Sequence, residues 1–124
     1  MSLFFLVSAI LLQGNILPVA PPRSILLFGN SAHPLIQQQW ELLRKDSSGL
    51  AERDVHIKRV EAGNALYNKY VVPVMDPFTI ILEGRDGGEK YRSNQLTPVT
   101  HFFALIDAMP MRQAEMRKKK KNQP

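Results

Sequence analysis

One short segment, residues 29–34, holds polar side chains of the kinds that do chemistry. Asn30, Ser31 and His33 precede Pro34, and proline is tolerated at the first position of a helix, where no backbone N–H is needed. Unpaired amides at a helix start attract anions, so these residues could hold an anionic or polar ligand. His33 could also act as a general acid or base beside Ser31. The alternative is that Ser31 or His33 only caps the helix.

A second group of chemically useful residues is basic and surrounds the segment Asp86-Gly87-Gly88. Arg85 precedes that turn, and Lys90 and Arg92 follow it in a segment expected to be a strand. The two-residue period of a strand places Lys90 and Arg92 on one face, where they could form a small anion-binding patch with Arg85. The alternative is a charged edge strand that resists pairing with other chains.

Other catalytic and metal-binding patterns are missing. The sequence has no cysteine, which excludes disulfides, thiol nucleophiles and thiolate metal sites. His33, His56 and His101 lack the spacing of metal ligands, and no serine-nucleophile or dinucleotide-binding signature is present. We therefore assign no catalytic residue, no metal and no cofactor.

The elements that must position these residues begin with a short apolar run, Ser24–Phe28, typical of a strand buried on both faces. Pro34 to Lys45 is predicted as a helix with Ile36, Trp40 and Leu43 on its apolar face, and the cluster 46–49 stops it. Residues 54–60 alternate apolar with polar, as a half-buried strand does.

In the second half, Asn64 to Val71 is predicted as a short helix that buries Leu66, Tyr67 and Tyr70 and ends before Pro73. Residues 78–82 and 89–92 are predicted as two strands of a hairpin. A last helix begins at Thr97-Pro98, and Pro110 kinks or ends it. Its apolar stripe consists of Val99, Phe102, Phe103, Ile106 and Met109.

The order strand, helix, strand, helix, hairpin, helix predicts an α/β protein with a mixed four-stranded sheet and helices on both faces. That layout resembles the thioredoxin fold, written βαβαββα. With 124 residues, of which 44% are hydrophobic and 22% charged, the chain has the size and composition of one folded domain. We expect this domain to span residues 23–112, between an N-terminal segment 1–22 and a basic tail 113–124.

Four stretches carry a closer resemblance: residues 26–28 with Pro34, residues 49–55, residues 78–82 with 86–88, and residues 103–112. Together they resemble an uncharacterised bacterial family of small exported thioredoxin-like proteins, related to domains in animal sushi-repeat-containing extracellular proteins. The resemblance covers essentially everything after Arg23, and the last stretch is its most specific part. It implies an exported thioredoxin-like domain without an established activity.

The thioredoxin layout gives the segment before Pro34 a particular meaning. In a thioredoxin the redox cysteines lie at the start of the first helix, where the amides and the helix dipole lower the pKa of the attacking thiol. Here His33 stands where the attacking cysteine would be, and Ile36 where its partner would be. Pro77 precedes a strand, as does the cis-proline that faces the redox site in thioredoxins, and its own bond could be cis or trans.

The N-terminal segment predicts export. Leu3 to Leu12 is apolar except for Ser8, which fits a signal-peptide core of about 7–15 residues and falls short of the ~20 that span a membrane. Prolines on both sides of Ala20 disfavour cleavage there, and Gly14 is another candidate site. An uncleaved anchor and a buried N-terminal element remain the alternatives, and Pro18, Pro21 and Pro22 form a stiff linker.

The net charge of +5 comes from one segment. Outside it, basic and acidic residues balance, so the basicity describes a tail and not a binding face. Its residues are Arg117, Lys118, Lys119, Lys120 and Lys121. This tail could contact an anionic surface or nucleic acid without sequence specificity, or it could be a solvated, mobile terminus.

The sequence thus favours an exported, non-redox binding module that recognises a protein or a small polar ligand. Its candidate ligand-binding residues are Asn30, Ser31, His33, Pro77, Arg85, Lys90 and Arg92. The alternatives are a cysteine-independent enzyme that uses His33, and anionic-surface binding through the tail. No specific nucleic-acid partner is expected.

Overall fold

The computed structural model of the chain describes residues 20–122. The elements are β1 (Arg23–Phe28), α2 (Pro34–Arg44), α3 (Ser47–Glu52), β2 (Val55–Val60), α4 (Leu66–Lys69), β3 (Thr79–Glu83), β4 (Glu89–Ser93), α5 (Val99–Asp107) and α6 (Pro110–Lys121). The predicted export segment, residues 3–12, lies outside the described residues. No helix between residues 20 and 122 has both the length and the apolar character needed to cross a membrane.

The sheet has four strands in the order β2-β1-β3-β4. β1 pairs with β2 in parallel, with Arg23 opposite Val55, and with β3 antiparallel, with Ser24 opposite Glu83. A parallel pair needs a crossover connection, which α2 and α3 supply, whereas β3 and β4 are joined by a short turn. The predicted mixed four-stranded sheet is confirmed.

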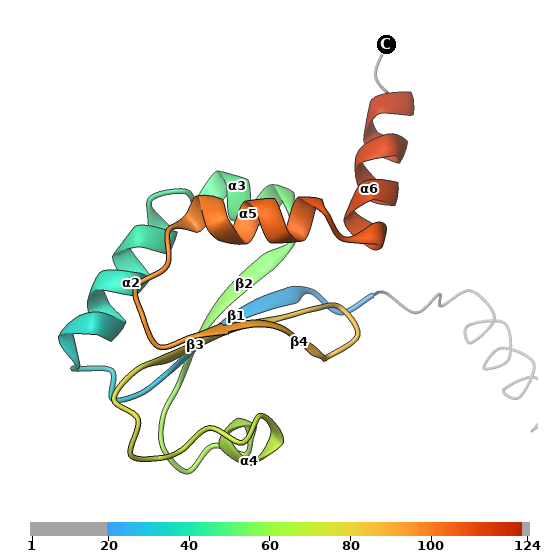
Figure 1. Cartoon of the computed structure of the whole chain (residues 1–124). Helices are drawn as coiled ribbons and strands as arrows, with labels where there is room; N and C mark the ends of the chain where they lie inside the picture. Colours follow the sequence, from blue (N-terminus) through green and yellow to red (C-terminus); the bar gives the residue numbers. More distant parts are fainter. Residues whose placement is uncertain (1–19, 123–124) are drawn as a thin grey trace, which may run out of the picture.

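Helices cover both faces of this sheet, as predicted. α2, α3 and α5 lie over one face and α4 over the other (Figure 1). β1 is buried along its whole length because it lies inside the sheet between these two layers. Its alternate side chains therefore enter separate cores, with Ile25 and Leu27 on the α2 and α5 side and Leu26 and Phe28 on the α4 side.

One polar side chain of α2, Gln39, is buried although the helical pattern predicted Trp40 on the buried face. Ile36 and Leu43 of α2 are buried as predicted, but Gln39 is buried as well, and Trp40 is only partly covered. The Gln39 amide accepts a hydrogen bond from the Thr97 backbone N–H at 2.7 Å and donates one to the Thr97 carbonyl at 2.9 Å. Trp40 lies under the Arg59 guanidinium, 4.2 Å from the ring centre. Gln39 thus joins α2 to the segment that begins α5.

The smaller core is aromatic. Tyr67 and Tyr70 meet the Phe28 ring edge-on, with ring centres 5.1 and 6.5 Å away. Burial raises the pKa of the Tyr70 hydroxyl, and a hydrogen bond to Glu83 raises it further. The hydroxyl also donates to the carbonyl of Gly87 at 2.9 Å, so α4 is tied to the end of the hairpin.

Two helices differ from the expected order. α2 ends at Arg44, one residue before the predicted end at Lys45, and residues 47–52 form the extra helix α3, which buries Leu50 against the larger core. Pro110 ends α5 and occupies the first turn of α6, because proline fits a helix start. α6 projects from the body of the domain and extends through Lys121, so the segment expected as a tail is helical as far as that residue (Figure 1).

Candidate functional site

In the segment before α2, the side chains stabilise the helix start. The Asn30 side-chain oxygen accepts from the Ala32 N–H at 2.9 Å, and His33 Nδ1 accepts from the Leu35 N–H at 3.2 Å. The Ser31 N–H donates to Glu61 at 3.1 Å. The capping interpretation of His33 is confirmed. Within residues 20–122 no hydrogen bond joins Ser31 to His33, so the geometry gives the general-base hypothesis no support.

Pro77 lies against this same segment, as the thioredoxin layout suggested. A Cβ atom on Gly29 would stand 2.5 Å from the Pro77 carbonyl oxygen, so the two loops touch at the end of β1. The bond before Pro77 is trans, since residues 20–122 contain no cis peptide. Pro77 thus lies beside Gly29, which directly precedes Asn30, at the end of β1. We refer to residues 29–34 together with Pro77 as the thioredoxin-like neighbourhood.

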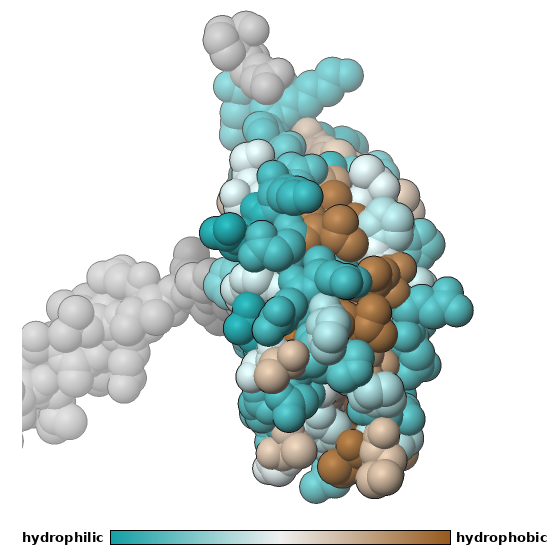
Figure 2. Space-filling view, turned by 90° about the vertical axis from the view of Figure 1, so that its left-hand side faces the viewer, coloured by the Kyte–Doolittle hydropathy of each residue, from teal (hydrophilic) through white to brown (hydrophobic). Residues whose placement is uncertain are grey.

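The outer surface of α2 borders this neighbourhood. A shallow depression of about 430 Å³ runs along it, with Leu42 and Leu96 among mainly polar side chains. Figure 2, which views the left-hand side of Figure 1, shows apolar residues as a narrow stripe between polar ones. A stripe this narrow is ordinary for a soluble protein surface.

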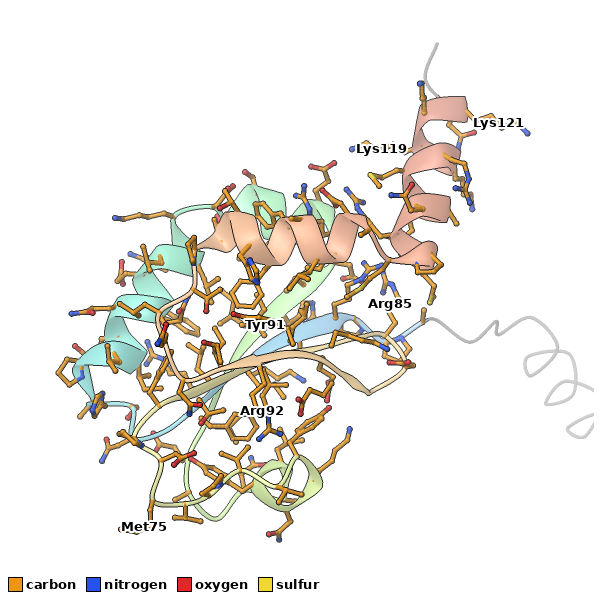
Figure 3. All side chains as sticks on the ribbon, in the orientation of Figure 1. Met75, Arg85, Tyr91, Arg92, Lys119 and Lys121 are labelled. Atoms are coloured by element: carbon orange, nitrogen blue, oxygen red, sulfur yellow. The ribbon has the colours of Figure 1, made fainter. Side chains whose placement is uncertain are left out.

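The basic residues of the hairpin do not form the single patch that was predicted. The β3–β4 register shifts between Leu82 and Glu83, which are opposite Tyr91 and Glu89, so Lys90 is the extra residue of a β-bulge. A bulge breaks the two-residue alternation of a strand. Lys90 therefore lies on the α5 and α6 side with Tyr91, while Arg92 points toward α4 and donates to the Tyr70 carbonyl (Figure 3).

Lys90 and Arg85 instead border a pocket of about 340 Å³ between the β3–β4 turn and the junction of α5 and α6. Its polar wall also includes Arg23, and its apolar wall is the segment Met109-Pro110-Met111. The Lys90 ammonium pairs with Asp86 at 2.8 Å at the exposed rim. β1 starts at this pocket and ends beside Pro77, so the pocket and the thioredoxin-like neighbourhood lie at opposite ends of the sheet.

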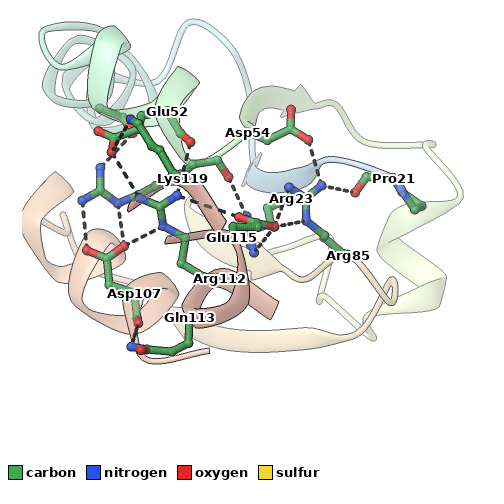
Figure 4. A network of polar contacts seen from close by, with 12 residues as sticks. Pro21, Arg23, Glu52, Asp54, Arg85, Asp107, Arg112, Gln113, Glu115 and Lys119 are labelled. Carbon is green, nitrogen blue, oxygen red and sulfur yellow. Dashed lines mark hydrogen bonds and ion pairs between the residues drawn. The ribbon is translucent and has the colours of Figure 1, made fainter. Parts of the chain in front are cut away.

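The cationic floor of the pocket is held by Glu115 of α6 (Figure 4). Arg23, whose side chain is 1% exposed, donates to both Glu115 oxygens at 3.2 and 3.3 Å. Arg85 donates to Glu115 at 3.0 Å and to Asp54 at 2.8 Å. It also donates to the Pro21 carbonyl at 2.8 Å, which ties the start of the domain to this cluster.

A second half of the network fixes α6 to α3 and α5. Arg53 makes a two-pronged ion pair with Asp107, at 3.0 and 2.9 Å, and stacks on the Phe103 ring at 3.9 Å. Arg112 is also paired to Asp107, at 3.1 Å, and reaches Glu52 at 3.4 Å. Paired guanidinium and carboxylate groups of this geometry are charge-assisted and directional.

These contacts alter the acidity of the carboxyl groups. Burial by itself would raise the pKa of Glu115, but the hydrogen bond and charge of Arg23, with the charge of Arg85, outweigh it and the pKa is lowered. The Arg53 hydrogen bond lowers the pKa of Asp107, with Arg112 adding to the effect against the opposing influence of burial. Both carboxylates are therefore ionised throughout the neutral range.

Sequence reasoning missed two residues that line the pocket, Arg23 and Met109, and Glu115, which pairs with Arg23. Arg23 and Glu115 are far apart in sequence, and nothing local indicates that they pair. Met109 was expected in the apolar stripe of the last helix, but it lies beyond α5, at the turn into α6. The one available signal was the family-like stretch 103–112, which includes this turn. In the part of the chain that the structure describes, no three histidine or acidic side chains gather as they would around a metal ion.

The sequence of residues 21–115 matches the family described as "Domain of unknown function (DUF4174)". The chain belongs to the DUF4174 family. The match begins at Pro21 and reaches Glu115, so it includes both ends of the ion-pair cluster that closes the pocket. Among curated proteins, no sequence match to this DUF4174 member is found.

Solved structures establish the fold of this DUF4174 domain as thioredoxin-like. Thioredoxin-2 of the malaria parasite, described as a component of protein secretion machinery, matches with a TM-score of 0.52 at 17% identity, over 77% of this chain and 90% of its own. Trxlp from Edwardsiella tarda matches at 0.52 and 19%, over 78% and 91%. A malarial protein matches at 0.53 and 19%, over 69% and 94%. Identities this low carry the fold and not the activity.

Proposed function

We propose that this chain is a non-redox binding module that takes its ligand in the pocket between the β3–β4 turn and the α5–α6 junction. The observation that carries the proposal is the pocket itself, in which Arg23, Arg85 and Lys90 face an apolar wall of Met109-Pro110-Met111. A concave site with apolar walls and a few convergent polar groups is the usual form of a ligand site.

The absence of thiol chemistry supports a binding role. The chain has no cysteine, and the position of an attacking thiol is occupied by His33, whose Nδ1 is engaged in capping α2. The fold is kept while the residues that define thioredoxin chemistry are missing. A retained scaffold without its reactive groups is best explained by recognition, with the specificity set by its loops.

The chemistry of the pocket suggests a ligand with two parts. An apolar body would contact Met109 and Met111, since methionine side chains adapt to irregular shapes. A carboxylate or similar anion would pair with Lys90 and displace Asp86, whose side chain is 63% exposed. That exchange costs little, because ion pairs at the surface contribute little to stability.

We also propose that the protein is exported, on the support of the apolar run Leu3 to Leu12. The N-terminus of the protein isolated from its native cells, read by mass spectrometry after fractionation, tests this. Recovery of the protein in an envelope or extracellular fraction would support export. Its first residue would then distinguish a cleaved signal peptide from a retained anchor. A full-length chain confined to the soluble cytoplasm would contradict it.

Octanoate is a suitable first probe for the pocket because it joins a carboxylate to an apolar chain. We expect octanoate, followed by two-dimensional NMR, to shift the amide signals of residues 84–90, Met109 and Met111. Octanol and acetate, which each supply one half of the chemistry, should bind more weakly. The variant Lys90→Gln should weaken octanoate binding about threefold, the effect of losing one partly exposed charge interaction.

His33→Ala is the matched control, because it changes a polar residue at the opposite end of the sheet. It should leave the octanoate affinity unchanged. If His33→Ala lost more octanoate affinity than Lys90→Gln, the binding site would lie at the end of the sheet that holds His33, and the proposal would be wrong. Equal binding of octanoate and octanol by the wild type would contradict the proposal that the ligand carries an anionic group.

A further inference from the structure

The end of α6 is the strongest concentration of charge on the molecule. Residues 117–121 are all basic and all exposed, and outside them the 11 acidic residues balance the basic ones. Of these five side chains, within residues 20–122, only Lys119 has an acidic partner, Glu52 at 3.5 Å. The other four cations face solvent.

Helical geometry decides the shape of this charge. Successive residues of an α-helix are rotated by about 100°, so five consecutive cations point to every side of the axis. Figure 3 shows Lys119 on the side of α6 toward the body and Lys121 on the outer side, at the far end of the projecting helix. The cations therefore surround the end of α6 and do not form a stripe along one face. Such a charged helix end suits a broad anionic surface better than a groove.

The position of this charged helix end is fixed, because side chains in the first two turns of α6 form ion pairs with the rest of the domain. Glu115 is paired with Arg23 and Arg85, and Arg112 with Asp107. Lys119 adds the contact with Glu52 farther along the helix. The five cations therefore keep a defined place relative to the sheet.

The chain that follows the apolar segment enters the domain next to the base of this helix. Arg85 holds the Pro21 carbonyl at 2.8 Å and Glu115 at 3.0 Å, so residue 21 and α6 meet at one side chain. The apolar run Leu3 to Leu12 lies a short stretch of sequence before that point. The described part of the chain thus begins beside the base of α6.

We infer that the basic end of α6, Arg117 to Lys121, binds the surface of an anionic lipid membrane. Each Lys or Arg close to such a surface strengthens binding several-fold, and a single apolar anchor becomes a stable one when a polybasic segment is added. Nucleic acid offers the same phosphate chemistry, but only a membrane would also receive the apolar run that precedes the domain in the sequence. This inference does not depend on the pocket.

Co-sedimentation of the full chain with lipid vesicles tests the inference. The vesicles are phosphatidylcholine alone, or a mixture in which about a third is phosphatidylglycerol. The variant Lys118→Gln, Lys120→Gln and Lys121→Gln removes three cations that have no acidic partner among the described residues. We expect it to bind the anionic vesicles about 100-fold more weakly than the wild type, with unchanged binding to the neutral ones.

The matched control removes three exposed cations elsewhere, as Arg44→Gln, Lys45→Gln and Lys58→Gln, and should lose less than threefold. Raising the salt concentration should weaken the wild type on anionic vesicles toward its level on neutral ones. An equal loss in both variants would overturn the inference, because net charge alone would then explain the binding. So would equal binding of the wild type to both vesicle types, or tighter binding to duplex DNA at matched phosphate concentration. Circular dichroism of each variant verifies that its fold is intact.

Discussion

At the scale of single residues, sequence reasoning was most successful where a side chain acts on its own neighbours in the chain. His33 caps α2 because its Nδ1 reaches an amide two residues away, a contact that needs no tertiary structure. Arg23 is the opposite case. In the sequence it only precedes the apolar run Ser24–Phe28, yet its side chain is 1% exposed and pairs with Glu115.

Gly29 gives a prediction at this scale. Its φ of +147° is unfavourable for other residues, and an added Cβ would lie 2.5 Å from the Pro77 carbonyl oxygen. We expect Gly29→Ala to lower the free energy of unfolding by about 2–3 kcal/mol, from backbone strain and overlap together. Urea denaturation followed by circular dichroism measures it.

Gly63→Ala is the control, because Gly63 also has a positive φ, +95°, but no atom would lie within 4 Å of its added Cβ. Gly63→Ala should therefore lower the free energy of unfolding only by the cost of backbone strain, about 1 kcal/mol. Equal losses in the two variants would show that contact between the Gly29 and Pro77 loops contributes nothing.

At the scale of elements, periodicity predicted most strands and helices but missed the bulge at Lys90 and the helix α3. The bulge at Lys90 separates it from Arg92, although an ideal strand would place the two on one face. The cluster 46–49 was expected only to stop the preceding helix, yet Ser47, Ser48 and Gly49 also begin the helix α3, whose Leu50 is buried in the core. Burial outweighs the weak local preference there.

The contact between α2 and the start of α5 yields a prediction for Gln39. Thr97 is 4% exposed, and both of its backbone groups are paired with the Gln39 amide. Gln39→Leu keeps the volume but leaves a buried N–H and a buried C=O without partners, so we expect a loss of about 2–4 kcal/mol in unfolding free energy. Thermal and urea unfolding measure this loss.

Gln38→Leu makes the same chemical change at the neighbouring, exposed position of α2. Its effect should stay within about 0.5 kcal/mol, as is usual for surface substitutions. If Gln39→Leu were as mild as this control, the paired amide would not be what joins α2 to α5.

At the scale of the whole molecule, the ion-pair network predicts how stability depends on pH. Glu115 and Asp107 have pKa values below their ordinary 4.5 and 3.8 in the folded state. The unfolded chain therefore binds more protons as the solution is acidified. The stability from these pairs is fully present above the ordinary carboxyl values and is lost as pH falls through the lower folded-state values.

Glu115→Gln tests this directly. At neutral pH we expect it to cost about 1–3 kcal/mol, because Arg23 and Arg85 lose their shared carboxylate. Below the ordinary carboxyl range, the difference from the wild type should shrink, since the wild-type carboxyl is then protonated too. Urea midpoints over a pH series measure both effects.

Glu41→Gln removes a carboxylate from an exposed pair with Arg44 and should change the midpoints little at any pH. A constant difference between Glu115→Gln and the wild type across the acid range would contradict the role of the Glu115 charge.

The sequence by itself determined the strand and helix pattern, the mixed sheet, the thioredoxin-like class and the impossibility of thiol chemistry. Those features follow from local periodicity, from proline and glycine, and from residue types that are present or absent. Only the tertiary structure decided that Arg85 and Lys90 share a pocket while Arg92 does not, and that Arg23 meets Glu115 across 92 positions of sequence. The physical reason is that ion pairs and bulges depend on strand register and on where α6 comes to lie, and both are set by packing between distant segments.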